Sequence, residues 1–408
     1  MTRYTFRLKL GALFYVMLLA LPAAASESTP GFQVVGRVDS RSLAHAVASP
    51  TIYAFDLSPT GRTLALLVRS GDNAEDIPTW LLVVDSKSGE ILRKVETGNL
   101  APYWTQTSYI LPQVLFTPDG KYLVLQELGE VRIVDTATLR TTGTVEGPKG
   151  TVPVSVCGSA GSDLIAVSFA KNWQRKSQLE KLPVYVEMID VPDAIPHGGW
   201  DSVDPPQALS PDGKLAAVSD WSVPGPLLKL AVIDTSSGRK LATLDGGFEF
   251  KKPWRGRIMG RIAGRFLSSK QIVLSPDGSW DRSGHYSGDS LRIVDSHDGK
   301  IVQELKPRRF GPTGEIRIAG GGREIVTASW YLPPSFYTHP HERMPLASAP
   351  GLLVYLKDGR FRLEANIGSL GGGSQIPGSA LPFQVSSDGS VIAAAQRFGV
   401  TIFERAGH

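Results

Sequence analysis

The segment Ala208–Trp221, ALSPDGKLAAVSDW, decides the fold because segments similar to it recur along the chain. It predicts a strand, a tight turn at SPDG and a second strand, since Pro211 presets the φ angle of the turn and Gly213 accepts a positive φ. Related segments are DLSPTGRTLALLV from Asp56, LFTPDGKYLVL from Leu115 and QVSSDGSVIAAA from Gln384. One supersecondary unit repeated along a chain indicates a repeat architecture.

Each unit continues into two further strands. In the quoted unit these are LLKLAVID and RKLATL, separated by the turn TSSG, so that four short strands follow one another in up-and-down order. An isolated four-stranded sheet leaves both faces partly bare. Sheets stacked radially cover each other's faces, which is the arrangement of a β-propeller. Six segments fit the third strand: LLVVDSKSG, EVRIVDTATL, VYVEMIDV, LKLAVIDTSSG, LRIVDSHDG and LLVYLKDG.

The two ends of the chain are expected to share one sheet. A seventh unit begins at Pro382 and ends in GVTIFER after only three strands, and FQVVGRV at Phe32–Val38 resembles the outer-strand segment GEILRKV. Pairing the ends removes open sheet edges. We therefore predict an all-β, seven-bladed β-propeller whose last blade is closed by an N-terminal strand. Six or eight blades stay open, because no clear outer strand follows VPDAIPHGG in the third unit.

One copy of SPDG is expected to lie outside the repeated turn. No apolar strand follows Gly278 in LSPDGSWDRSGHYSG, so the turn of that unit is predicted at Leu267–Gln271. The Asp-Gly pairs of the repeats are interpreted as turn residues rather than calcium ligands.

The chain resembles the broad bacterial group of exported propellers of the YVTN and quinoprotein-like type. LSPDGKLAAVSD followed by VIDTSSGRKLATL carries this resemblance, and TolB-like repeats share its first half. The typical Trp-Asp pair of WD repeats is replaced here by Val-Asp or Ile-Asp. The resemblance implies the propeller fold over most of the mature chain. It implies no single function, since the group contains binding platforms and enzyme subunits.

The first 25 residues are expected to be a signal peptide. Arg3, Arg7 and Lys9 precede the apolar stretch LGALFYVMLLAL, and cleavage is expected after Ala25. Residues 26–408 would then form a single propeller domain, periplasmic or secreted, with no membrane span after cleavage. Removal of three basic residues leaves a net charge of +1, which gives no indication of a nucleic-acid partner. The single cysteine, Cys157, permits no intrachain disulfide and is expected to be a small buried residue.

Loop lengths predict one functional face. Turns between first and second strands, and between third and fourth strands, are short, whereas the other connections hold the insertions. The long connections are Arg69–Thr79, Ala170–Leu182, Asp220–Pro226, Asp277–Asp289, Ser329–Pro350, Gly98–Pro112, Pro196–Pro205, Gly246–Gly256 and Gly368–Leu381. These connections all open on the same side of a propeller, which we call the long-loop face. Binding residues gather on loops held by a rigid scaffold.

Aromatic and basic residues follow the same division. All eight tryptophans are expected in or beside these loops, and Lys251, Lys252, Arg255, Arg257 and Arg261 surround Trp254. Such a cluster could hold an acidic glycan, a phosphate group or a protein carboxylate. The expected binding residues are Trp104, Trp200, Trp254, Arg255, Arg257, Trp280, Trp330 and Tyr337.

No catalytic motif stands out. The sequence holds no C-x-x-C-H, G-x-S-x-G, H-E-x-x-H or Walker pattern. His339 and His341 lie two residues apart and could reach one metal, with His285 or His197 as a possible third ligand. No cofactor is predicted, and a metal stays open. The leading hypothesis is a non-catalytic exported propeller for a protein partner or an envelope glycan. The alternative is an enzyme or enzyme subunit with a metal or redox cofactor in the central funnel.

Overall fold

The structure is a computed structural model that describes most of the predicted strands. It describes residues 32–71, 77–100, 112–127, 129–171, 181–223, 225, 227–248, 260–278, 291–305, 316–330, 350–356, 361–366, 383–396 and 399–406. The predicted signal peptide lies outside these residues. Among the residues described, no helix has the length and apolar character needed to cross a membrane.

Among the described residues the regular elements are strands, apart from one short helix. The elements are β1 (Phe32–Asp39), α2 (Ser40–Leu43), β2 (Pro50–Leu57), β3 (Thr63–Ser70), β4 (Ile77–Asp85), β5 (Ile91–Leu100), β6 (Gln113–Phe116), β7 (Tyr122–Glu127), β8 (Glu130–Asp135), β9 (Thr141–Val145), β10 (Val152–Gly158), β11 (Leu164–Ala170), β12 (Val184–Asp190), β13 (Ile195–Ser202), β14 (Ala208–Leu209), β15 (Leu215–Asp220), β16 (Leu227–Asp234), β17 (Lys240–Leu244), β18 (Gly260–Ser268), β19 (Gln271–Gly278), β20 (Leu291–Asp295), β21 (Ile301–Leu305), β22 (Ile316–Ala319), β23 (Glu324–Trp330), β24 (Pro350–Leu356), β25 (Phe361–Asn366), β26 (Phe383–Val385), β27 (Val391–Gln396) and β28 (Gly399–Arg405).

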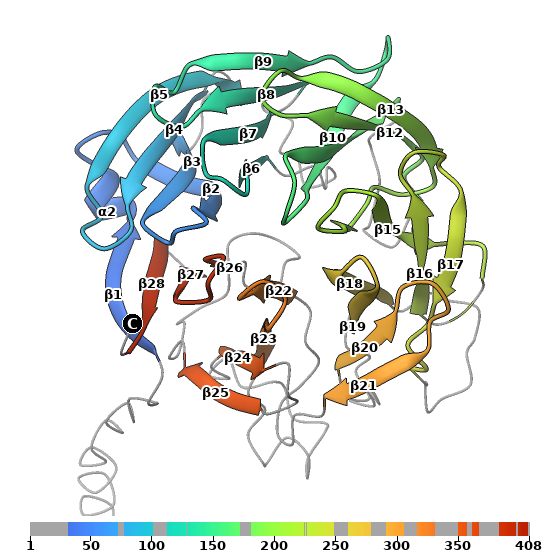
Figure 1. Ribbon diagram of the computed structural model, residues 1–408. Helices are drawn as coiled ribbons and strands as arrows, with labels where there is room; N and C mark the ends of the chain where they lie inside the picture. Colours follow the sequence, from blue (N-terminus) through green and yellow to red (C-terminus); the bar gives the residue numbers. More distant parts are fainter. Residues whose placement is uncertain are drawn as a thin grey trace, which may run out of the picture.

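Strand pairing follows the repeated unit. Separate four-stranded sheets are formed by β2–β5, β6–β9, β10–β13 and β22–β25, and another has the order β1-β28-β27-β26. The remaining strands form a larger sheet in which β14–β17 and β18–β21 are joined by a short parallel contact between β16 and β18. Figure 1 shows these four-stranded units placed in chain order around a central axis, with β2, β6 and β22 near the middle. The architecture is therefore all-β and propeller-like.

The apolar core lies between the sheets. Leu64 and Leu66 of β3 pack with Val391 and Ile402 of the sheet that contains both chain ends. Ala65 and Leu67 point the other way, toward the β6–β9 sheet. Alternate residues of a strand face opposite sides of its sheet, so each second strand serves two cores. Further clusters fill the spaces between the other neighbouring sheets.

The predicted turns are stabilised by their own side chains. The hydroxyl of Ser210 donates to Asp212 at 2.6 Å and accepts the backbone N–H of Leu215 at 2.9 Å. Gly213 has a φ of 71°, as the sequence predicts. The same pattern at Ser386, Asp388 and Val391 confirms the turn interpretation of the Asp-Gly pairs.

The aspartate that ends many third strands has a second role. Asp234 accepts hydrogen bonds from the hydroxyls and backbone N–H groups of Ser236 and Ser237. These bonds favour the ionised carboxylate and lower the pKa of Asp234 to about 2. Asp85, Asp135 and Asp295 accept comparable backbone bonds in their own turns. The Asp of the Val-Asp or Ile-Asp pair thus fixes the turn that follows it.

Two expectations about strands are resolved by the pairing. The predicted turn at Leu267–Gln271 is confirmed, since β18 and β19 pair up to Ser268 and Gln271. Pro276, Asp277 and Gly278, however, continue β19 rather than opening a loop. The placement of Pro196–Pro205 in a connection between blades was wrong, because most of it belongs to β13, the outer strand that the third unit had lacked.

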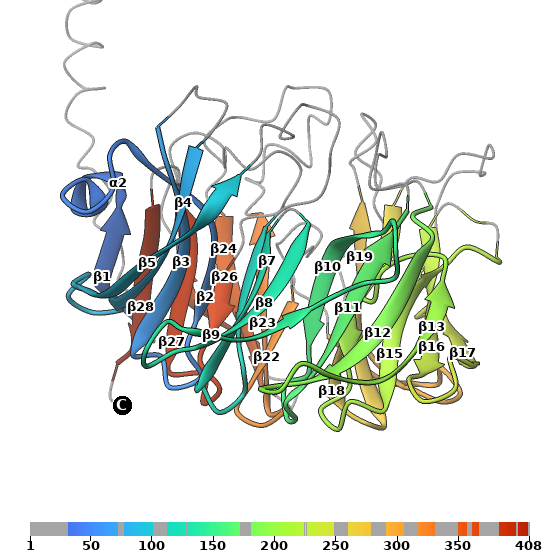
Figure 2. The same cartoon turned by 90° about the horizontal axis from the view of Figure 1, so that it is seen from above.

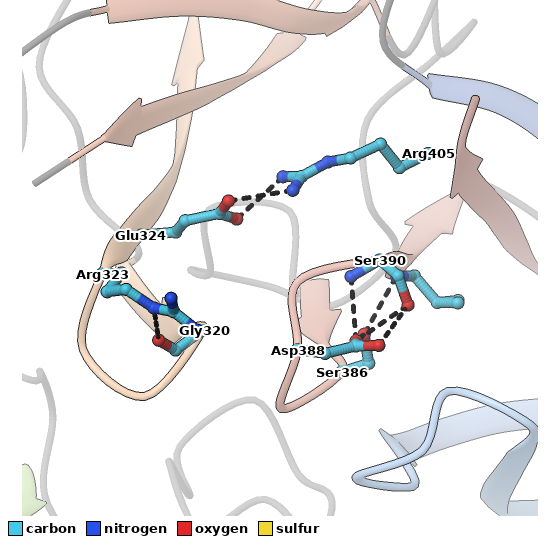
Figure 3. A network of polar contacts seen from close by, with 8 residues as sticks. Gly320, Arg323, Glu324, Ser386, Asp388, Ser390 and Arg405 are labelled. Carbon is cyan, nitrogen blue, oxygen red and sulfur yellow. Dashed lines mark hydrogen bonds and ion pairs between the residues drawn. The ribbon is translucent and has the colours of Figure 1, made fainter. Parts of the chain in front are cut away.

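The two ends of the chain pair as predicted, and β1 runs antiparallel to β28 from Phe32↔Arg405 to Asp39↔Gly399. An ion pair ties this sheet to the preceding one (Figure 3). Arg405 donates to the two carboxylate oxygens of Glu324 in β23 at 2.9 and 2.7 Å. Its guanidinium carbon also lies 5.2 Å from the centre of the Phe32 ring. A bidentate pair of this kind fixes both distance and orientation.

Deleting residues 32–38 is expected to destabilise the fold, because β28 loses a paired strand and Val38 leaves its buried position. The expected loss is on the order of several kcal/mol, which lowers the melting temperature by roughly 5–10 °C. Calorimetry measures this change in melting temperature. Val34→Thr is the control, since Val34 lies on the same strand and is 59% exposed, and it should stay within about 0.5 kcal/mol. An unchanged melting temperature in the deletion would contradict the structural role of β1.

Candidate functional site

Polar side chains gather on the innermost strands. Each keeps part of its surface exposed, although these strands lie nearest the axis (Figure 1). We call this group the axial ring, and it consists of Asp56, Gln113, Cys157, Gln207, Arg265, Arg317 and Gln384.

Strand register places several ring members at one level. Asp56 pairs with Ala65, the third residue of β3, and Cys157 pairs with Ala166, the third residue of β11. Arg265, Arg317 and Gln384 pair with the third residues of β19, β23 and β27 in the same way. Five different sheets thus contribute a side chain from an equivalent position.

The ring members satisfy the exposed edges of neighbouring strands. An innermost strand has no partner on its axial side, so its backbone groups need other hydrogen bonds. The carboxylate of Asp56 accepts the N–H of Phe116 at 2.7 Å, and the amide oxygen of Gln113 accepts that of Val156 at 2.7 Å. Each bond joins one sheet to the next.

The arginines make similar contacts. Arg265 donates to the carbonyl oxygens of Gln207 and Gly264 at 2.7 and 2.9 Å. Arg317 donates through Nε to the amide oxygen of Gln384 at 2.8 Å. Both guanidinium groups are therefore held in defined positions beside the axis.

The surroundings of the ring change its acid–base chemistry. Loss of hydration raises the pKa of Asp56 to about 7, against the opposing effects of hydrogen bonds from Phe116 and Leu57 and of the Arg317 charge. Burial likewise raises the pKa of the Cys157 thiol, opposed by the charges of Arg265 and Arg317. Both groups keep some contact with solvent.

These features define what the ring can do chemically. The thiolate is the nucleophilic form of cysteine, and a raised pKa keeps Cys157 largely in the thiol form. The ring instead combines two fixed cations, two or more amide groups and a carboxyl that is partly protonated near neutral pH. Such a set suits the binding of a polar ligand.

The structure places few of the sequence-predicted binding residues. Trp330 ends β23, and the structure describes no side chain for it. Outside the described residues lie Trp104, Trp254, Arg255, Arg257, Trp280, Tyr337, His285, His339 and His341. Their convergence on one face therefore stays a prediction.

Trp200 was expected in a long connection, but it lies in strand β13. Only 7% of it is exposed, and it packs in the core between the β10–β13 and β14–β17 sheets. A Cβ added to Gly238 would lie 2.5 Å from the Cβ of Trp200. The tryptophan therefore packs against the turn before β17, which explains its burial without a ligand.

The axial ring was missed by the sequence analysis. For three of its members the sequence signal is a polar residue two positions before the turn serine, in Asp56-Leu-Ser, Cys157-Gly-Ser and Gln384-Val-Ser. Aligning the repeats by turn would have exposed this position. Cys157 was expected to be buried and is in fact partly exposed.

A metal site is not formed by the described residues, among which no three His, Cys, Asp or Glu side chains are grouped suitably. His285, His339 and His341 lie outside that part of the chain. His197 lies in β13, where its Nε2 is 3.3 Å from a carboxylate oxygen of Asp190.

Comparisons with known proteins bear on the fold. No family model matches the chain. No curated protein matches it by sequence. A chain in the crystal structure of the mitotic checkpoint complex is similar over 93% of this chain and 92% of its own length, with a TM-score of 0.52 and 12% sequence identity. At that identity the likeness supports the propeller-like fold alone.

A second similar structure is hydrazine synthase from Kuenenia stuttgartiensis. The match covers 88% of this chain and 96% of the hydrazine synthase chain, with 15% sequence identity and a TM-score of 0.49. A similarity of this size carries no argument about function.

Asp56→Asn is expected to flatten the pH dependence of stability. The pKa of Asp56 is about 7 in the folded chain and 3.8 in the reference state, so the folded chain binds more protons between these values. Raising the pH from 4 to 7 therefore destabilises the wild type through this group, and the variant lacks that contribution. Urea unfolding across this range measures the difference.

Asp234→Asn is the matched control. Its pKa of about 2 means that its stabilising effect is present above the reference value of 3.8 and is lost as the pH falls toward 2. It should leave the slope between pH 4 and 7 unchanged. A wild-type slope that persists in Asp56→Asn would refute the raised pKa.

Proposed function

We propose that this protein is an exported, non-catalytic β-propeller of seven blades that presents its long-loop face to a protein partner or an envelope glycan. Residues 1–25 would be removed as a signal peptide, and β1 would close the ring. The choice of face rests on a single observation, namely that the short and the long connections lie at opposite ends of the strands.

Closure is supported by contacts around the whole ring. The innermost strands contact one another in chain order, from β2 to β6, β10, β14, β18, β22 and β26, and β26 in turn contacts β2. Seven apolar clusters fill the spaces between neighbouring sheets, including the space between the last sheet and the first. A closed ring leaves no sheet face uncovered.

The long-loop face is supported by the strand bounds. Every turn from first to second strand, and from third to fourth strand, spans at most five residues. The wider intervals fall between second and third strands or between sheets, as between Ala170 and Val184 or between Trp330 and Pro350. Antiparallel pairing puts these two classes of connection at opposite ends of the strands. Figure 2 shows the short turns along the lower edge of the side view.

At the short-turn end, polar side chains are engaged in hydrogen bonds within the turns. Its serine, threonine and aspartate side chains bond to their own turns, as at Thr117 and Asp119. The longer connections therefore join the strands at the opposite end, where a rigid scaffold can hold binding residues. The cluster around Trp254 and Arg255 suits an acidic glycan or a protein carboxylate.

Changing Trp254 and Arg255 together to alanine should weaken binding, whereas Lys121→Ala with Lys214→Ala should not. An interface Trp or Arg can contribute about 2 kcal/mol, which is roughly thirtyfold in affinity. The control lysines are exposed in turns at the short-turn end. Pull-down from an envelope extract or a glycan array identifies the ligand, and titration with it measures both variants. Loss of binding in the lysine variant alone would place the function on the other face.

The alternative is an enzyme or enzyme subunit with a metal or redox cofactor at the axis. It is favoured by one observation, namely that titratable groups with raised pKa values line the centre of the ring. Metal analysis of the purified mature protein after gel filtration discriminates between the two functions. The proposed function predicts no stoichiometric zinc or copper, whereas retained metal that is lost in His339→Ala with His341→Ala would favour the enzyme.

A further inference from the structure

The first and last strands of the described chain meet at the short-turn end. β1 begins at Phe32, which pairs with Arg405, the last residue of β28. The backbone N–H of Arg405 donates to the carbonyl oxygen of Ser390, in the short turn before β27. Figure 2 shows β1 running from the edge that carries the short turns toward the opposite edge. Any segment that precedes Phe32 therefore leaves the fold on the side away from the long-loop face.

The position of β1 is fixed by contacts on both of its sides. A Cβ added to Gly36 would lie 2.4 and 2.8 Å from the carbonyl oxygens of Ser86 and Lys87, in the turn between β4 and β5. The ammonium group of Lys87 also forms an ion pair with Glu404 of β28 at 2.8 Å. Val38 is buried in the apolar cluster shared by the first and last sheets. β1 is therefore held between β28 and the first sheet, with its Phe32 end among the short turns.

The predicted signal peptide lies a short distance before this point in the sequence. Six residues, 26–31, separate the expected cleavage site from β1, and a segment of that length reaches at most roughly 20 Å when fully extended. The eight residues of β1 alone span roughly 25 Å. The segment is therefore too short to lay the long-loop end of β1 against a membrane that holds residues 1–25.

We propose that the membrane-held precursor stands with its short-turn end toward the bilayer and its long-loop face pointing away, so that this face can bind its ligand before residues 1–25 are removed. The inference rests on the proposed function, because it uses both the export of the chain and the choice of binding face. It also narrows the kind of ligand. A face that points away from the membrane meets molecules of the envelope space, and not components of the same bilayer.

Cysteine accessibility in the full-length precursor tests this orientation. Ala23→Leu with Ala25→Leu keeps the precursor uncleaved, because small residues are needed at these positions before the cleavage site. Two single-cysteine reporters are made in a Cys157→Ser background. Ala48→Cys reports on the long-loop end, before β2, and Arg62→Cys reports on the short-turn end, before β3, and both positions are exposed. Spheroplasts that carry each precursor are treated with a maleimide on a long polyethylene glycol chain.

The reaction rates are compared with those of the same reporters in the cleaved, soluble protein. Arg62→Cys should react several-fold more slowly in the precursor, whereas Ala48→Cys should react at similar rates in both forms. Slowing at Ala48→Cys alone, or equal rates at the two positions in the precursor, would overturn the orientation. Lys171→Cys and Lys214→Cys, exposed at the same two ends, are a second pair for the case that a reporter of the first pair does not fold.

Failure of the proposed function gives a different result. If neither cysteine reacts until the membrane is permeabilised, the chain is not exported, and both the proposed function and this orientation are refuted. An error in the binding face alone leaves these reaction rates unchanged, and it is detected by titration of the Trp254 and Arg255 variant.

Discussion

The structure depends on the burial of two faces of each four-stranded sheet. Every second strand carries apolar side chains on both sides, so that Leu64 and Leu66 require one neighbour while Ala65 and Leu67 require another. A sheet at the end of a linear stack would leave one of these faces in water. In the proposed closed ring no sheet has such an end, and the pairing of β1 with β28 completes the last sheet. Arg405 strengthens this junction through Glu324 and Phe32.

The same arrangement creates the axial ring. Sheets that stand around an axis expose their innermost edges to each other, and the backbone groups on those edges need partners. Asp56, Gln113 and Arg265 bond to backbone groups of a neighbouring sheet. Arg317 bonds to the side chain of Gln384 in the next sheet. A structural requirement thus brings charged groups to the centre of the molecule, where their hydration is reduced and their fields overlap.

Sequence predicted the parts of this structure that depend on local chemistry. The Ser-Pro-Asp-Gly turns, the displaced turn near Leu267 and the pairing of Phe32–Val38 with the last unit all follow from residues close together or from a missing strand. The outer strand β13 was missed because its sequence, IPHGGWDS, holds two glycines and one proline and has an almost wholly exposed burial pattern. Strand formation there depends on pairing with β12, which no local propensity reveals. The axial ring was missed because it is assembled from strands far apart in the sequence, and the register position that five of its members share is not marked by one motif in all the repeats.

The central claim is that the N-terminal strand is an integral part of the last sheet. Amide hydrogen exchange followed by mass spectrometry tests this claim most directly, by comparing peptides from Phe32–Asp39 with peptides from Thr141–Val145, another outer strand. The account predicts similar protection in the two segments, since both are paired on one edge only. Rapid exchange throughout Phe32–Asp39, with β28 still protected, would show that the strand is not held in the sheet and would contradict the account.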